Sequence, residues 1–173
     1  MRSVPTIDLS AYRADEFDAD YFETLALACK DMGFFLLKGH GLDELISEVF
    51  AESKSFFSEE KEYKYLVRRD EDNPLGYFDR ELTKRKRDQK EVFDFKTGGH
   101  ISKNPLRHSR WPEQPEKLRP TLTAFFSAFT QMSEQVMAMV LMALGLPESS
   151  ARNTVADLSL IHISEPTRPE RSG

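Results

Sequence analysis

The most regular hydrophobic pattern in the chain lies near its C-terminal end. Between Leu118 and Leu144, apolar side chains recur at intervals of three or four residues, apart from adjacent pairs. Because an α-helix turns once in about 3.6 residues, this spacing predicts a helix of about 40 Å with one continuous apolar face. Gly145 and Pro147 follow directly, and both residue types favour the end of a helix.

Two shorter helices are predicted in the first third of the chain. Apolar residues fall at helical spacing from Phe22 to Met32, and Gly33 comes where that helix ends. A second, wider apolar stripe runs from Leu42 to Phe57. Both patterns are typical of amphipathic helices that pack one face against a core.

Four short segments predict β-strands. Val4–Leu9 alternates between apolar and polar residues, and Phe34–Leu37 is a continuous apolar run that suits a strand buried on both faces. Gly76–Phe78 lies within a charge-dense stretch, and Glu91–Phe95 follows it. Together with the helices, these strands indicate an α+β fold with one long helix.

Composition narrows the class of protein. The 173 residues carry a net charge of −5 and are 39% hydrophobic, which suits a single folded region and gives no electrostatic reason to expect a nucleic-acid partner. The longest apolar run, Val136–Leu146, is well short of the roughly 20 residues that span a bilayer. The single cysteine, Cys29, fits a reducing compartment. We therefore expect a cytoplasmic location and no membrane partner, while the oligomeric state stays unpredicted.

The histidines do not form a recognisable metal motif. A facial triad for non-haem iron commonly places His and Asp or Glu two residues apart, and none of the four histidines has an acid at that spacing. The two-histidine zinc pattern with an intervening Glu is also missing. The sequence therefore predicts no metal ligand, and we expect His40, in a turn flanked by glycines, to have a structural role.

Other reactive or charged features favour ordinary structural interpretations. Cys29 falls on the apolar face of its predicted helix, which favours a small core residue over a reactive thiol. The basic cluster Lys84–Arg87 is surrounded by acidic residues and lacks aromatic neighbours, so a solvated loop is favoured over a phosphate-binding site. No nucleophile motif is present, and no catalytic residue is predicted.

A set of motifs resembles a known family when taken in order. The segments that carry the resemblance are VPTIDLS at Val4–Ser10, GFFLLKGHG at Gly33–Gly41, FFSEEKEYK at Phe56–Lys64, Gly76-Tyr77, D-x-K-E-x-F-D at Asp88–Asp94, N-x(6)-W-P at Asn104–Pro112 and LGLP at Leu144–Pro147. This order resembles the opening of the 2-oxoglutarate/Fe(II)-dependent dioxygenases of the isopenicillin N synthase-like group. The resemblance covers about Val4 to Pro147.

The resemblance implies a jelly-roll enzyme that uses O2 and 2-oxoglutarate to oxidise a small organic substrate. The part present here would be the N-terminal region of helices and strands that flanks the jelly roll, within residues 1–157, with most of the catalytic jelly roll missing. In the family, the His-x-Asp pair, the distant second His and the Arg-x-Ser pair come later in the chain and have no matching positions here. Fe(II) and 2-oxoglutarate would therefore bind the intact parent, and we expect this chain alone to be inactive.

The family resemblance also suggests two substrate-facing residues. Near Gly76 the family's chain can approach the substrate, which makes Tyr77 and Phe78 the candidates. The alternative interpretation is simple packing of a short strand. The alternative function is a non-catalytic helical interaction or dimerisation module, which predicts a stable, defined oligomer instead of an enzyme fragment.

The last sixteen residues have a different character from the rest. Residues Leu158–Arg168, LSLIHISEPTR, are identical to the in-frame translation of a common transposase-type sequencing adapter. This identity predicts that residues 158–173 are a non-native tail and that the native sequence stops near Asp157. His162 lies in this tail and is therefore not a candidate ligand.

Overall fold

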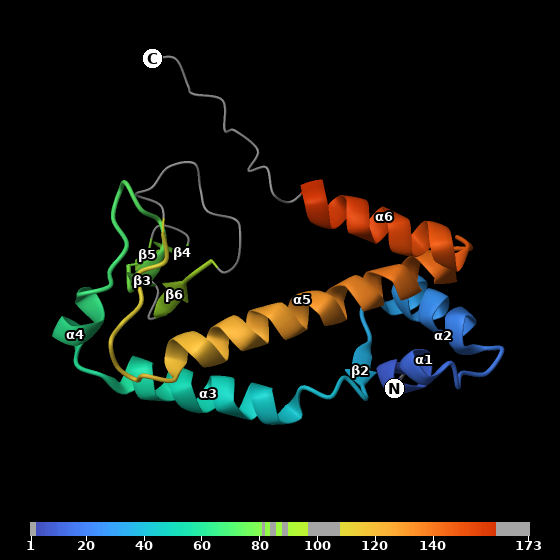
Figure 1. The fold of residues 1–173 in the computed structure, drawn as a ribbon, viewed down its shortest axis with the longest axis horizontal. Helices are drawn as coiled ribbons and strands as arrows, with labels where there is room; N and C mark the ends of the chain where they lie inside the picture. Colours follow the sequence, from blue (N-terminus) through green and yellow to red (C-terminus); the bar gives the residue numbers. More distant parts are fainter. Residues whose placement is uncertain (1–2, 81, 84–85, 88–89, 97–107, 162–173) are drawn as a thin grey trace, which may run out of the picture. The chain divides into compact units, whose positions relative to one another are not determined.

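The computed structural model describes residues 3–80, 82–83, 86–87, 90–96 and 108–161. The chain divides into two compact units: Met1–Gly41 with Phe129–Gly173 form the first, and Leu42–Ala128 form the second. The predicted long helix is confirmed as α5, Leu118–Ala143, whose beginning belongs to the second unit and whose end belongs to the first (Figure 1).

The first unit has a small core between helices and a two-stranded parallel sheet. Its elements are β1 (Thr6–Asp8), α1 (Leu9–Ala14), α2 (Tyr21–Leu27), the π-helical turn η1 (Ala28–Met32), β2 (Leu36–Lys38), the end of α5 and α6 (Glu148–Ile161). β1 pairs with β2 so that Ile7 lies opposite Leu37. The fully buried members of this core are Ile7, Leu9, Leu25 and Met139. Cys29 packs against this core, as its position on the apolar helix face predicted.

Several boundaries in the first unit differ from the prediction. The predicted strand Val4–Leu9 is shorter, because the Asp8 side chain accepts hydrogen bonds from the Ser10 and Ala11 N–H groups and starts α1 at Leu9. The predicted helix after Asp20 is present, but its last five residues form η1, and Gly33 ends it with a positive φ of 75°. Helices α1 and α6 are additional to the prediction.

The expectation that Phe34–Leu37 forms a strand buried on both faces was wrong. The strand is Leu36–Lys38, and the side chains of Phe34 and Leu36 are both 57% exposed. Residues alternate between the two faces of a strand, so Leu37 packs on the core while Leu36 lies on the opposite face. A sheet of two strands with helices on one side leaves that second face open.

A single carboxylate joins the two strands to α1. Asp8 Oδ1 accepts a 2.6 Å hydrogen bond from the Ser10 hydroxyl, and Asp8 Oδ2 lies 3.0 Å from Lys38 Nζ at the end of β2. Gly39 follows with a φ of +67°, and a Cβ at this position would lie 2.5 Å from Asp8 Oδ1. Beyond it, Arg13 Nη1 donates to the His40 backbone oxygen at 3.1 Å, consistent with a structural role for this turn.

The second unit contains the predicted second helix and the two later predicted strands, which the structure pairs with each other. Its elements are α3 (Asp43–Ser58), α4 (Lys61–Tyr65), β3 (Gly76–Phe78), β4 (Leu82–Thr83), β5 (Lys86–Arg87), β6 (Val92–Asp94) and the beginning of α5. β3 and β6 are antiparallel, with Tyr77 opposite Phe93. The core of this unit contains Phe56, Val67, Tyr77, Leu118 and Leu122, with Phe93, Phe95 and Trp111 packed against it.

The basic cluster is only partly within the described residues. Lys86–Arg87 form the short strand β5, which pairs with Leu82–Thr83, where the charge pattern predicted a loop. Lys84 and Arg85 lie outside the described residues. The charge pattern alone does not show a hairpin, because two-residue strands are too short to display an alternating apolar face.

A pair of glycine variants tests the junction at Asp8. Gly39 and Gly41 have similar φ values, +67° and +73°, but nothing lies within 4 Å of a Cβ at Gly41. We expect Gly41→Ala to cost only the left-handed strain of an L-residue, about 1–2 kcal/mol. Gly39→Ala should cost about a further 1–3 kcal/mol, because its Cβ overpacks against Asp8 and Ser10. Urea unfolding followed by circular dichroism measures both, and equal losses would contradict the role of the junction.

The pH dependence of stability offers a second test of the same carboxylate. The Ser10 side-chain hydrogen bond, followed by Lys38, lowers the pKa of Asp8 from 3.8 to about 2. A depressed pKa stabilises the folded form above pH 3.8, and this contribution disappears as the pH falls toward 2. Asp8→Asn should therefore flatten the loss of thermal stability in this interval while keeping the helix cap. Identical pH profiles for variant and wild type would show that Asp8 does not carry this stability.

Candidate functional site

Strand β3 holds both residues predicted to face a substrate, and its geometry depends on Gly76. The Tyr77 N–H donates to the Val67 carbonyl at 2.9 Å, and the Tyr77 carbonyl accepts from the Arg69 N–H at 3.0 Å. Gly76 has a φ of +122°, and a Cβ there would collide with the Val67 carbonyl oxygen. Only glycine allows this close approach, so the conformation of the backbone explains why the Gly-Tyr motif begins with glycine.

Tyr77 is a packed core residue. Its side chain has no exposed surface, and its ring makes an edge contact with Phe56 and a tilted contact with Tyr65. Lys64 Nζ lies 5.5 Å from the ring centroid, within the range of a cation–π contact. These contacts match the packing interpretation of the strand, whereas contact of Tyr77 with a substrate stays a prediction.

The hydroxyl of Tyr77 is buried without a hydrogen-bond partner among the described residues. Burial raises the pKa of this phenol well above its ordinary value, and the negative charges of Glu91 and Asp79 raise it further. Glu91 lies close enough to affect this pKa, although its oxygens do not meet hydrogen-bond geometry. The hydroxyl therefore stays protonated.

Phe78 differs from Tyr77 because its side chain is only partly buried. The Arg69 guanidinium carbon lies 3.5 Å from the centroid of the Phe78 ring. Arg69 is held there by Asp94, whose Oδ2 accepts from Nη1 at 3.2 Å. Of the two candidates, Phe78 is therefore the one whose side chain is partly exposed.

Two lysines of the FFSEEKEYK motif connect α4 to the strands. Lys64, which is 5% exposed, donates to the Phe57 carbonyl at 2.9 Å and to Glu91 Oε2 at 2.8 Å. Lys61 lies 2.7 Å from Asp79 Oδ2, and its hydrogen bond with Asp79 raises the lysine pKa. The sequence motifs contained these residues, but the sequence alone did not show that Lys64 meets Glu91 of D-x-K-E-x-F-D.

The described residues do not fit an iron site. No group of three or more His, Cys, Asp or Glu side chains in this part of the chain could hold a metal ion. His40 and His108 are described, whereas His100 and His162 lie outside the described residues. No chemical step through iron is therefore assigned to residues of this chain.

A matched pair of lysine variants tests which ion pair stabilises this region. Lys64→Met should lower the free energy of unfolding by about 2 kcal/mol, since the Phe57 carbonyl and Glu91 lose a charged donor at a buried position. Lys61→Met should lower it less, because the Lys61 side chain is 49% exposed and the Tyr65 hydroxyl still donates to Asp79. Chemical unfolding of both variants is the measurement, and an equal or reversed order would refute the assignment.

A comparison with protein families identifies what these motifs belong to. Residues 4–114 match the family described as the non-haem dioxygenase in morphine synthesis N-terminal region. The chain belongs to this family. The matched range contains the Asp8 junction, strand β3 and the Lys64–Glu91 pair, and it spans every motif described above except LGLP.

The curated relatives include 2-oxoglutarate-dependent dioxygenases. The chain is 26% identical to a homoarginine-6-hydroxylase of Oryza sativa subsp. japonica, over 90% of this chain and 53% of that protein. It is 32% identical to the validamycin A dioxygenase of Streptomyces hygroscopicus subsp. limoneus, over 83% of this chain and 44% of that protein. The chain spans about half the length of the curated relatives it matches.

Solved structures show the same fold over the same part. A 2OG-Fe(II) oxygenase family protein from Caulobacter crescentus matches with a TM-score of 0.64 and 19% identity, covering 86% of this chain and 50% of that one. A full-length Neurospora crassa protein, solved in complex with alpha-KG and 5-formyluracil, matches with a TM-score of 0.66 and 21% identity, covering 87% and 46%. Among the described residues, no helix is long and apolar enough to cross a membrane.

Proposed function

We propose that this chain is the N-terminal part of a 2-oxoglutarate- and Fe(II)-dependent oxygenase that acts on a small organic substrate. The family match over residues 4–114 carries the proposal. The relatives include 2-oxoglutarate-dependent dioxygenases, of which the chain covers about half. In this proposal the iron ligands and the 2-oxoglutarate-binding residues lie in the other half of the protein, and the present chain is not active alone.

Within that protein, the present chain would support the active site and contribute to its wall. Phe78 is the stronger candidate for contact with the substrate, because its ring is partly exposed and Arg69 stacks on it. Tyr77 would act mainly by holding β3 against α3 and α4. Both assignments rest on the family resemblance at Gly76-Tyr77.

The extent of the native region is also a proposal. We assign residues 1–157 to the dioxygenase region and residues 158–173 to an adapter-derived tail. In the structure, Leu158–Ile161 continue α6, and residues 162–173, including His162, lie outside the described residues. The net charge of −5 gives no reason to expect a nucleic-acid partner, and the single cysteine fits a reducing compartment such as the cytoplasm.

The test compares the 173-residue chain with the complete product of its reading frame. The complete product should convert 2-oxoglutarate to succinate in an Fe(II)-dependent reaction, whereas the shorter chain should bind Fe(II) only weakly in a calorimetric titration. In the complete product, Phe78→Ala should raise the KM for the substrate more than it lowers kcat. An unchanged KM would remove Phe78 from the site.

The same preparations distinguish the alternative function. A non-catalytic interaction module predicts that the 173-residue chain forms a stable oligomer of defined mass and that the complete product turns over no 2-oxoglutarate. Light scattering after gel filtration measures the mass. That pair of results would replace the oxygenase proposal.

A further inference from the structure

The strand pair β3–β6 has two faces, and Arg69 lies over the face that is turned away from the core. Residues paired across two strands share a face, and neighbours along one strand alternate. Phe78, paired with Val92, therefore lies on the face opposite Tyr77, and Asp94 lies on the same face as Phe78. The Arg69 N–H donates to the Tyr77 carbonyl at 3.0 Å, and the guanidinium carbon lies 3.5 Å from the centroid of the Phe78 ring.

Several contacts fix the position of Arg69. Arg110 donates from Nη1 to the Arg68 carbonyl and from Nη2 to the Asp70 carboxylate, so it holds the residues on both sides of Arg69. The Arg69 side chain is held by Asp94, whose Oδ2 accepts from Nη1 at 3.2 Å. A guanidinium that is already in place loses little freedom when it binds a ligand, and this lowers the entropic cost of binding.

Most of the hydrogen-bonding capacity of Arg69 is left for a ligand. Among the described residues, Asp94 is the one acceptor that its side chain reaches, and it uses a single N–H group of Nη1. Nη2 and Nε together form an edge of the guanidinium that binds a carboxylate through two parallel hydrogen bonds. The Arg69 side chain is 26% exposed, so part of it is accessible to a small molecule.

The neighbouring charges favour an anion with a single charge. Arg110 is engaged by Asp70 and the Arg68 carbonyl, so one guanidinium, that of Arg69, is available at this place. A carboxylate matches one guanidinium in charge and in planar geometry, whereas a phosphate carries close to two negative charges. The Asp94 side chain is 45% exposed, so water screens its repulsion toward an incoming carboxylate.

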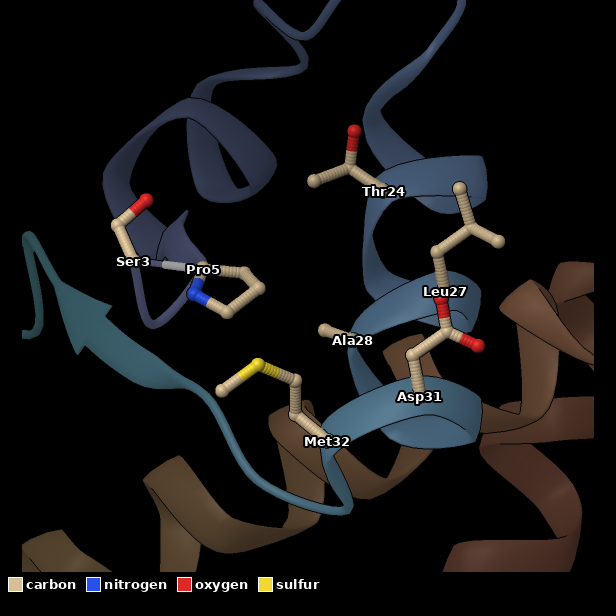
Figure 2. Close-up of a pocket in the computed structure, with 7 residues that line it drawn as sticks. All are labelled: Ser3, Pro5, Thr24, Leu27, Ala28, Asp31 and Met32. Carbon is tan, nitrogen blue, oxygen red and sulfur yellow. The ribbon is translucent and has the colours of Figure 1, made fainter. Parts of the chain in front are cut away.

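A groove in the first unit has no comparable anchor for an anion. It has a volume of about 460 Å³ and lies between the segment Ser3–Pro5 and the helical turns of α2 and η1 (Figure 2). Among its described lining residues, the one that carries a charge is the carboxylate of Asp31. A carboxylate on the substrate is therefore expected at Arg69 and not in this groove.

We propose that Arg69 is a specificity-determining residue that binds a carboxylate group of the substrate through Nη2 and Nε. The apolar part of the substrate then lies beside Phe78 and Val92, on the same face of the strand pair. This inference rests on the proposed function and narrows its substrate class to organic carboxylic acids. Asp94 and Arg110 hold the guanidinium in the position that this contact requires.

Calorimetric titration of the complete gene product tests this contact, with benzoate as the probe and benzamide as its uncharged counterpart. Fe(II) and saturating 2-oxoglutarate are present and oxygen is excluded, so that the 2-oxoglutarate site is filled and no turnover occurs. We expect benzoate to bind at least about 10-fold more tightly than benzamide, because a neutral amide cannot form the charged, two-bond contact with a guanidinium.

Three variants locate the binding site of benzoate. Arg69→Gln and Arg69→Lys should each weaken benzoate binding by about 10-fold or more, because neither new side chain has the planar fork of arginine. Arg80→Gln is the matched control, since it removes the same charge two residues from Phe78. The Arg80 side chain is 62% exposed and lies beside Asp79, so this control should leave the affinity for benzoate unchanged.

Three results would overturn the inference. These are no benzoate binding by the wild type, equal binding of benzoate and benzamide, and an affinity for benzoate that Arg69→Lys leaves unchanged. Arg69→Lys keeps a cation beside Asp94, so it decides the question even where Arg69→Gln does not fold. Fe(II)-dependent succinate formation is measured in air with the same preparations. Succinate formation without benzoate binding would sink only the carboxylate contact, and Arg69-dependent benzoate binding without succinate formation would sink only the proposed function.

Discussion

The carboxylate of Asp8 is the interaction on which the first unit depends most. It ends β1, caps α1, accepts from the Ser10 hydroxyl and pairs with Lys38 of β2. Its position leaves no room for a side chain at residue 39, where the backbone already requires a positive φ. The motifs VPTIDLS and GFFLLKGHG, which are far apart in the sequence, therefore meet at the Asp8 carboxylate. Each motif supplies residues that the conformation of the other requires.

Contacts between residues of separate motifs also organise the second unit. Gly76 brings β3 against the Val67 carbonyl, and Lys64 ties the end of FFSEEKEYK to Glu91 in D-x-K-E-x-F-D. Each motif alone consists of common residues, but each supplies one partner of a specific contact. This explains why the set of motifs, taken in order, identifies the non-haem dioxygenase N-terminal family.

The elements that the sequence predicted are those whose own residues carry a clear hydrophobic pattern. Helices α3 and α5 and strands β3 and β6 were predicted, because long amphipathic stripes and apolar runs bounded by loops are local signals. Helix α1 has six residues and depends on the Asp8 cap, and α6 buries only Ala151 and Val155 in its described part. Neither helix has enough apolar positions to show the helical repeat of about 3.6 residues. The exposure of Phe34 and Leu36 was missed, because a continuous apolar run does not show whether other elements cover one face of the strand or both.

For the candidate site, the sequence located β3 but not the environment of its side chains. Burial of Tyr77, the stacking of Arg69 on Phe78 and the buried Lys64 depend on contacts between segments distant in the chain. Such contacts leave no trace in local spacing, and the family resemblance pointed to β3 without showing them.

The most direct measurement for the proposal is the nucleotide sequence of the source locus beyond the codon for Asp157. The proposal predicts an open frame that departs from LSLIHISEPTR and continues to a His-x-Asp pair, a distant His and an Arg-x-Ser pair. Codons for Leu158–Gly173 present in the genome and followed directly by a stop codon would contradict it.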